Sequence, residues 1–289
     1  MKMNYKENCP LKDFTTLKIG GPAARLYQPS TPEKLEQVLH DAKERNVRLF
    51  ILGNGSNVLF ADEGFDGWII NLAENWSGIE DLENHRVRVK SGTTNEQLAQ
   101  HAARHGLAGY EFASGIPGTI GGAVYMNAGA YDGETKDVLV SVDYMDLDGQ
   151  IHTIAAEDLE LGYRHSWFEN HPGIILSAVY QFQPGEPMQI AEKIADLKKR
   201  RWDKQPMDKA SAGSTFKRPK GSYASKLIHE CGLQGTHIND AQVSTKHAGF
   251  LINNGNATCK DFLDLASLVI ETVKKETGFE LELEVRIIR

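Results

Sequence analysis

The sequence predicts a mixed fold of α-helices and β-strands, divided into about two domains. Its 289 residues are 40% hydrophobic and 25% charged, as in an ordinary globular protein. Segments with helical periodicity alternate along the chain with short apolar runs of strand composition. No repeat of fixed period and no low-complexity tract interrupts this pattern. The chain is therefore long enough to build large cores, and it fits neither the disordered nor the coiled-coil class.

The first helix is predicted to begin directly after the capping residue Thr31, with Pro32 at its first position. Apolar residues then recur at helical spacing until Asn46, which ends the helix. An apolar run at 48–52 predicts a strand that leads into a tight turn. The further elements expected here are strands at 67–72 and 85–90, a helix at 94–105, and a hairpin of residues 138–146 and 150–155.

The rest of the chain is predicted to form a compact α/β domain after a connecting helix. That helix, 188–204, carries Ile190, Ile194 and Leu197 on one face. Its basic run at 198–201 is interpreted as a solvated face, with a phosphate-facing patch as the alternative. The elements expected after it are a helix at 222–231, a strand at 249–253, a helix at 261–277 and a final strand at 281–289.

Charge and composition exclude several classes of partner. Lysine and arginine total 32 against 39 acidic residues, a net charge of −7, so neither a general nucleic-acid binder nor a binder of anionic membranes is expected. No run approaches about 18 consecutive apolar residues and no apolar signal region follows Met1, which predicts a cytoplasmic protein. The three cysteines lie far apart and predict reduced thiols. His101 and His105 lie one helical turn apart, but no carboxylate near them in the sequence offers a third ligand, so no metal site is predicted.

Glycine is concentrated in two turns that can hold a pyrophosphate through main-chain N–H groups. Glycine permits positive φ and exposes amides, so such turns need few cationic side chains. The first turn is not a Rossmann fingerprint, because Val58 stands where the third glycine is needed, and it lacks the Gly-Lys-Ser/Thr of a Walker loop. Ordinary loops are the alternative for both turns. The candidate cofactor-binding residues are Gly53, Asn54, Gly55, Ser56 and Asn57 in the first turn and Gly115, Ile116, Pro117, Gly118, Ile120, Gly121 and Gly122 in the second.

Charged residues at the C-terminal end form a second candidate site. Strand alternation places Glu282, Glu284 and Arg286 on one face of the final strand, opposite a row of apolar residues. They can face a cleft or form a solvent-exposed ladder of ion pairs. Two further candidates, Arg164 and Ser214, lie at turns and fit a surface arginine and a turn serine equally well. Residue types alone leave these alternatives open.

Ordered motifs run through nearly the whole chain, at residues 15–23, 52–57, 111–131, 162–166, 212–217, 247–253 and 283–286. In their order and content the chain resembles the UDP-N-acetylenolpyruvoylglucosamine reductase (MurB) family, in its second, shorter type. The resemblance implies an α+β fold with an FAD-binding domain of the vanillyl-alcohol-oxidase type at 1–187, in two subdomains divided near residue 72. The connecting helix at 188–204 and a C-terminal α/β substrate-binding domain at 205–289 complete the implied organisation.

The resemblance also implies a reaction of peptidoglycan precursor synthesis. NADPH reduces non-covalently bound FAD, and the enolpyruvyl ether of UDP-N-acetylglucosamine is then reduced to UDP-N-acetylmuramate. Arg164 would stabilise the developing enolate, Ser214 would protonate it and Glu284 would polarise it, while Lys217 and Arg286 would contact the substrate, Lys217 at its diphosphate. A monomer is expected. The alternative is another FAD-linked oxidoreductase of the same fold acting on a hydroxy acid or a sugar.

Overall fold

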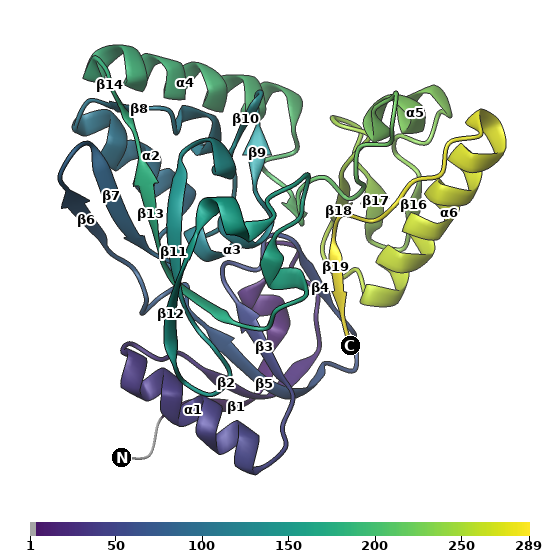
Figure 1. Cartoon of the computed structure of the whole chain (residues 1–289). Coiled ribbons are helices and arrows are strands. Elements are labelled where there is room, and N and C mark those ends of the chain that lie inside the picture. Colours follow the sequence, from purple (N-terminus) through teal and green to yellow (C-terminus); the bar gives the residue numbers. More distant parts are fainter. Residues whose placement is uncertain (1–3) are drawn as a thin grey trace. The chain divides into compact units, whose positions relative to one another are not determined.

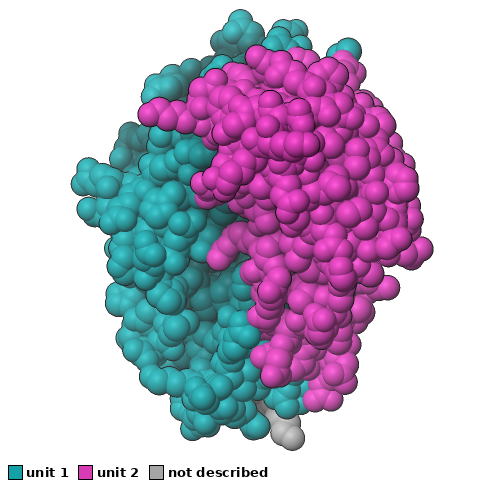
Figure 2. All heavy atoms as spheres, turned by 90° about the vertical axis from the view of Figure 1, so that its right-hand side faces the viewer, with its two compact units in different colours: residues 1–6, 25–54, 67–200 teal, residues 7–24, 55–66, 201–289 magenta. Residues whose placement is uncertain are grey.

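A computed structural model describes residues 4–289 of the chain. They form two compact units, which Figure 2 colours separately. Unit 1 takes the residues up to Lys6 with Arg25–Asn54 and Gly67–Arg200, and unit 2 takes Glu7–Ala24, Gly55–Asp66 and Arg201–Arg289. The domain limits at 187 and 204 stay a prediction. Within residues 4–289, no helix combines the length and the apolar character that crossing a bilayer requires.

The first sheet has the strand order β1-β2-β5-β3, and helix α1 (Pro32–Glu44) packs against it (Figure 1). Thr31 caps α1 as predicted, because its side chain accepts a hydrogen bond from Lys34 N at 3.4 Å. The buried face of the helix packs on Trp68 and Ile70. The strands are β1 (Tyr5–Pro10), β2 (Pro22–Tyr27), β3 (Leu49–Leu52) and β5 (Phe65–Asn71), with β3 and β5 parallel.

The second sheet lies in unit 1 and is antiparallel, in the order β12-β11-β13-β7-β6. Its core is built from alternate strand residues such as Val87 and Val89, together with Leu98 of the neighbouring helix α2. Its strands are β6 (Ile79–Leu82), β7 (Arg86–Lys90), β11 (Leu139–Met145), β12 (Ile151–Ala155) and β13 (Ile174–Gln181). Its helices are α2 (Asn95–Arg104), α3 (Ile120–Tyr125) and α4 (Pro187–Lys204), of which α4 is the predicted connecting helix.

Short elements complete unit 1. The pair β8 (Leu107–Ala108) and β14 (Gln183–Pro184) and the pair β9 (Gly129–Ala130) and β10 (Gly133–Glu134) are both antiparallel. Single 3₁₀ turns occur at Glu111–Ala113, Thr135–Asp137, Ala156–Leu159 and Trp167–Glu169.

Unit 2 has its own apolar core, in which Phe262 and Leu265 of the long helix α6 pack with Leu227 and Leu251. The core packs on a sheet with the strand order β15-β18-β17-β16. The elements of unit 2 are a 3₁₀ turn at Leu11–Phe14, β4 (Val58–Phe60), β15 (Ala210–Ser211), α5 (Ala224–Glu230), β16 (His237–Ile238), β17 (Ala241–Val243), β18 (Leu251–Asn253), α6 (Cys259–Thr277) and β19 (Arg286–Ile288). The predicted helices and the strand at 249–253 are confirmed, with ends shifted by one to two residues.

The C-terminal strand is shorter than predicted. Only β19 forms a strand, parallel to β4 with Arg286 opposite Val58. The prediction of one alternating strand over 281–289 is wrong, because β4 has only three residues to offer as partners. Leu283 makes a single antiparallel bridge to Phe216 instead. The C-terminal segment therefore contacts two different parts of unit 2 in turn.

Candidate functional site

The two glycine turns meet at Gly53 in unit 1. A Cβ at Gly53 would lie 2.4 Å from Thr119 Oγ1, so only glycine allows this approach of the first turn to the second. The Asn71 side chain supports the same place by donating hydrogen bonds to the carbonyls of Leu52 at 3.2 Å and Gly53 at 2.8 Å. Turns that are about 60 residues apart in the sequence thus lie together, as expected of two halves of one binding site.

The second turn is held by helix α2. Gly118 has a φ of +134°, which favours glycine, and its carbonyl accepts from Asn95 N at 3.2 Å. The Asn95 side chain also donates to Ile116 O at 3.3 Å. The first residue of α2 therefore fixes the conformation of the turn from its buried position.

Two main-chain amides of the second turn are already used within the protein. Ile120 N donates to Thr93 O and Gly121 N donates to Ser91 O, each at 2.8 Å. A Cβ at Gly121 would lie 3.0 Å from the Ser91 Cβ, so this glycine allows α3 to pack on the end of β7. Gly121 and Ile120 support the turn, and their amides are not the ones that can bind an anion. Gly122 is different, because a Cβ added there would have Thr119 Oγ1 as its nearest neighbour, at 3.9 Å.

The second half of the first turn belongs to unit 2 and connects to the C-terminal segment. Gly55 has a φ of +62°, and a Cβ there would lie 2.1 Å from Phe14 O. The Asn57 side chain donates to Glu284 O at 3.1 Å, and Asn57 O accepts from Arg286 N at 3.1 Å. These two contacts hold the main chain of residues 284 and 286, and the binding of the cofactor by Asn57 stays a prediction.

Ser214 and Glu284 are held on two paired segments of unit 2. Glu284 N donates to Thr215 O at 2.8 Å, and two residues further on Lys217 N donates to Glu282 O at the same distance. Ser214 is exposed and Glu284 is half-buried. The structure therefore brings these two predicted residues together on adjacent stretches of chain.

Arg164 projects from a tight turn in unit 1. Gly162 and His165 exchange main-chain hydrogen bonds around the turn, and Arg164 has a φ of +55°. A long side chain in this region of φ costs about 1–3 kcal/mol and persists where the surroundings enforce it. Its guanidinium donates to Gly129 O at 3.4 Å and lies 5.0 Å from the Tyr163 ring. The turn holds Arg164 in a fixed place, and its role in catalysis stays a prediction.

Asn127 enforces this turn and was not identified as a site residue from the sequence. It is fully buried, and its side chain donates to Gly162 O at 2.9 Å and to the Glu134 carboxylate at 3.1 Å. Lys136, with its ammonium 2.7 Å from Glu134, and then Asn127 lower the pKa of the Glu134 carboxyl, so it stays charged. The sequence signal for this role was the place of Asn127 within the ordered motif at 111–131.

Lys217 and Arg286 are placed at the surface of unit 2. Lys217 is half-exposed and its ammonium lies 3.4 Å from the Glu282 carboxylate. Arg286 is exposed on β19. The next residue after Lys217, Arg218, stacks its guanidinium 4.0 Å from the Tyr223 ring.

Comparison with known proteins decides the family. Residues 205–288 match the family model described as the C-terminal domain of UDP-N-acetylenolpyruvoylglucosamine reductase, and residues 23–155 match an FAD binding domain. A reductase of that name from Clostridium novyi is 45% identical over 99% of this chain and 93% of its own length. The chain belongs to the UDP-N-acetylenolpyruvoylglucosamine reductase family. A second reductase of that name, from Clostridioides difficile, is also 45% identical, over 99% of this chain and 94% of its own length.

A solved structure of this family has the same fold. The crystal structure of UDP-N-acetylenolpyruvylglucosamine reductase (MurB) from Thermus caldophilus superposes with a TM-score of 0.87 at 37% identity, over 100% of both chains. The family resemblance, the α+β fold with an FAD-binding domain and the assignment as a flavin-dependent oxidoreductase are therefore confirmed.

The residues around the second turn fit a flavin nucleotide. Among residues 4–289, the buried hydroxyls of Ser91 and Ser114 are without a hydrogen-bond partner, and Ser114 directly precedes the turn. A buried hydroxyl without a partner costs free energy unless a ligand satisfies it. A Cβ on Gly122 would meet nothing closer than 3.9 Å, so the main chain at this glycine leaves room for a ligand.

Proposed function

We propose that this protein uses NADPH to reduce the enolpyruvyl ether of UDP-N-acetylglucosamine to UDP-N-acetylmuramate. The observation that carries the proposal is the pairing that holds Ser214 beside Glu284, within the domain that matches this family. Bound FAD supplies the transfer of hydride from NADPH to the substrate methylene carbon. The residues of the chain then have to bind the substrate, stabilise the charge that develops and deliver a proton.

Arg164 is proposed to stabilise the negative charge. Hydride addition at the methylene carbon leaves charge on the adjacent carbon and the carboxylate attached to it. A guanidinium can pair with a carboxylate through two hydrogen bonds, and these strengthen as the charge grows. The fixed turn around Arg164 supports this role, because a preorganised group loses little freedom during the reaction.

Ser214 is proposed to deliver the proton and Glu284 to polarise the enolate. A serine hydroxyl is a weak acid, so it works only beside a strongly basic carbon in a fixed position. The left-handed conformation of Gly213, with a φ of +77°, sets the direction in which Ser214 leaves the main chain. Asn57 is proposed as a positioning residue, since it holds the main chain of Glu284.

Lys217 and Arg286 are proposed to bind the nucleotide-sugar. The ion pair between Lys217 and Glu282 is at the surface, and such pairs contribute about 0–1 kcal/mol. A diphosphate can therefore replace the Glu282 carboxylate as the partner of Lys217 at small cost. We further propose that the protein acts as a monomer in the cytoplasm, with 1–187 as the FAD-binding domain and 205–289 as the substrate-binding domain.

The reaction can be tested by separating its two halves. Without oxygen, NADPH should bleach the yellow flavin of the purified protein, and the enolpyruvyl nucleotide sugar should then restore the colour in one turnover. Failure of this substrate to reoxidise a flavin that NADPH has bleached would overturn the proposal. Bleaching by a hydroxy acid or a sugar in place of NADPH would instead establish the alternative, a different FAD-linked oxidoreductase.

A further inference from the structure

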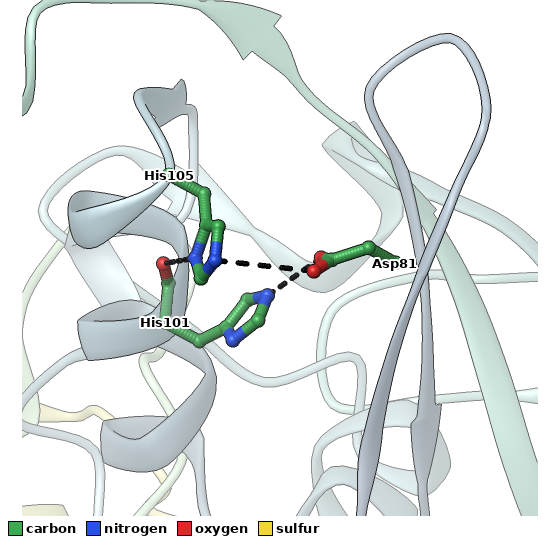
Figure 3. Close-up of side chains that lie close together, drawn as sticks. All are labelled: Asp81, His101 and His105. Carbon is green, nitrogen blue, oxygen red and sulfur yellow. Dashed lines mark hydrogen bonds and ion pairs between the residues drawn. The ribbon is translucent and has the colours of Figure 1, made fainter.

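Three potential metal ligands lie together at the C-terminal end of α2, in unit 1. His101 and His105 come from consecutive turns of the helix, and Asp81 comes from β6, which the sequence alone did not place near them (Figure 3). His101 Nε2 lies 2.7 Å from one Asp81 carboxylate oxygen, and His105 Nε2 lies 3.9 Å from the other. The ligand atoms of all three residues lie within 4.8 Å of one another.

The hydrogen bonds of His105 prepare its ring to bind a cation. His105 Nδ1 lies 2.8 Å from His101 O, and a carbonyl oxygen can only accept, so Nδ1 carries the proton. In the neutral ring the lone pair is then on Nε2, the nitrogen that faces Asp81. A hydrogen bond that fixes the tautomer from the second ring nitrogen is typical of histidines that ligate metals.

The surroundings favour a positive ion and allow it to enter. The two imidazole rings are stacked with centroids 4.0 Å apart, which puts both on the same side of the helix. They lie in the last turn and at the cap of α2, where the helix dipole is negative and attracts cations. Side-chain exposure is 13% for His101, 48% for His105 and 54% for Asp81. His101 is therefore the inner ligand, and an ion can enter from the side of His105 and Asp81.

We propose that Asp81, His101 and His105 form a binding site for a divalent transition-metal ion, with Zn²⁺ as the best match. Two imidazole nitrogens and one carboxylate oxygen suit Zn²⁺, whereas Mg²⁺ and Ca²⁺ prefer oxygen ligands alone. Ligands of tetrahedral zinc lie about 3.3 Å apart at Zn–N distances of about 2.0 Å. The ligand atoms of the three residues lie within 4.8 Å of one another. The ion would replace the hydrogen bond of 2.7 Å from His101 Nε2 to Asp81, and the proton on Nε2 would be released when the ion binds.

The ion would connect two parts of unit 1. It would join the end of α2 to β6, while the first residue of α2 holds the second glycine turn through Asn95. Water fills the fourth position of a zinc ion with three protein ligands. The site is proposed as a structural clip, because the ion would hold the C-terminal end of α2 to β6 and none of its ligands is a residue of the proposed reaction.

Titration of the chelator-treated, FAD-loaded full-length protein with Zn²⁺ tests the site. Isothermal titration calorimetry should show one site, and Zn²⁺ should raise the melting temperature, because a ligand that binds the folded state stabilises it. We expect roughly tenfold or more loss of affinity in each of Asp81→Asn, His101→Ala and His105→Ala. X-ray absorption of the zinc-loaded protein should show two imidazole ligands.

His40→Ala is the matched control, because His40, Asp41 and Glu44 form the other cluster of potential ligands found among residues 4–289. It should leave the affinity unchanged. The proposal is overturned if the parent protein does not bind Zn²⁺, if His40→Ala abolishes binding, or if the three site variants bind as the parent does. Circular dichroism without metal checks that each variant is folded, and the three independent variants keep the test valid if one is not.

Discussion

At the scale of single residues, the candidate groups of unit 2 owe their positions to main-chain hydrogen bonds. Glu284 donates from its amide to Thr215 O and accepts at its carbonyl from Asn57 Nδ2. These bonds fix the main chain from which the Glu284 and Ser214 side chains project. The side chains of Glu284 and Ser214 take no part in them. Substitutions that change only a side chain should therefore alter chemistry with little effect on the fold.

Ser214→Ala should separate the two halves of the catalytic cycle. NADPH should bleach the flavin at the parent rate, because this step takes no proton from Ser214. Reoxidation by the enolpyruvyl substrate should slow by roughly 10²–10⁴-fold, the range for a lost general acid. Stopped-flow absorbance measures both steps. Equal slowing of both halves would indicate a displaced flavin, and an unchanged second half would exclude Ser214 as the proton donor.

Glu284→Gln keeps the shape of the side chain but removes its charge and its acid function. The second half-reaction should slow by roughly 10²-fold or more, because one polarising group is lost. The melting temperature should stay near that of the parent, since the main-chain bonds of residue 284 remain. Single-turnover reoxidation and thermal melting are the two measurements. Parent-like turnover would leave the C-terminal segment with a structural role only.

At the scale of elements, the short helix α3 depends on a glycine for its contact with the end of β7. Gly121→Val should lower flavin occupancy strongly, because a side chain there meets Ser91 at 3.0 Å or less. Absorbance of the purified variant at the flavin band measures occupancy. Gly122→Ala is the control for folding, since its Cβ would lie 3.9 Å from the nearest atom. Full occupancy in a folded Gly121→Val protein would contradict this account.

Helix α6 begins with a capping box that makes its stability depend on pH. Thr258 N donates to the Asp261 carboxylate at 2.9 Å and Asn239 donates to it at 2.7 Å, and these hydrogen bonds lower the pKa of Asp261. Asp261→Ala should reduce the free energy of unfolding by about 0.5–2 kcal/mol at neutral pH.

The sign of the pH effect follows from the direction of that shift. A carboxyl with a lowered pKa stabilises the fold above its usual pKa, and this contribution disappears as the pH falls through the folded-state pKa. The difference in the free energy of unfolding between Asp261→Ala and the parent should therefore shrink as the pH falls from neutral to below the usual pKa of an aspartate. Urea titration of both proteins at neutral and at acidic pH measures the free energy of unfolding. Asp264→Ala, an exposed position on the same helix, should show little difference at either pH.

At the scale of the whole molecule, the cofactor should be held without a covalent bond. None of the three cysteines or ten histidines lies in either glycine turn, so neither turn offers the usual attachment residues. Acid precipitation should release all the flavin into the supernatant, where absorbance measures it. Yellow colour that stays with the precipitated protein would disprove this prediction.

The sequence by itself determined the local elements and the motifs. Thr31 and Pro32 marked the start of α1, helical spacing marked α4, and the glycine turns marked the cofactor region. These features depend on residues close together in the chain, through capping, φ preferences and the period of apolar side chains. The family could be recognised for the same reason, because its motifs are short and ordered.

Only the tertiary structure decided which distant residues meet. It ended the C-terminal strand after three residues, because β4 is only that long. It assigned the Gly121 amide to Ser91 and brought Asp81 to His101 and His105. Such contacts depend on where separate elements come to lie when their apolar faces are buried, and no local pattern in the sequence records that arrangement.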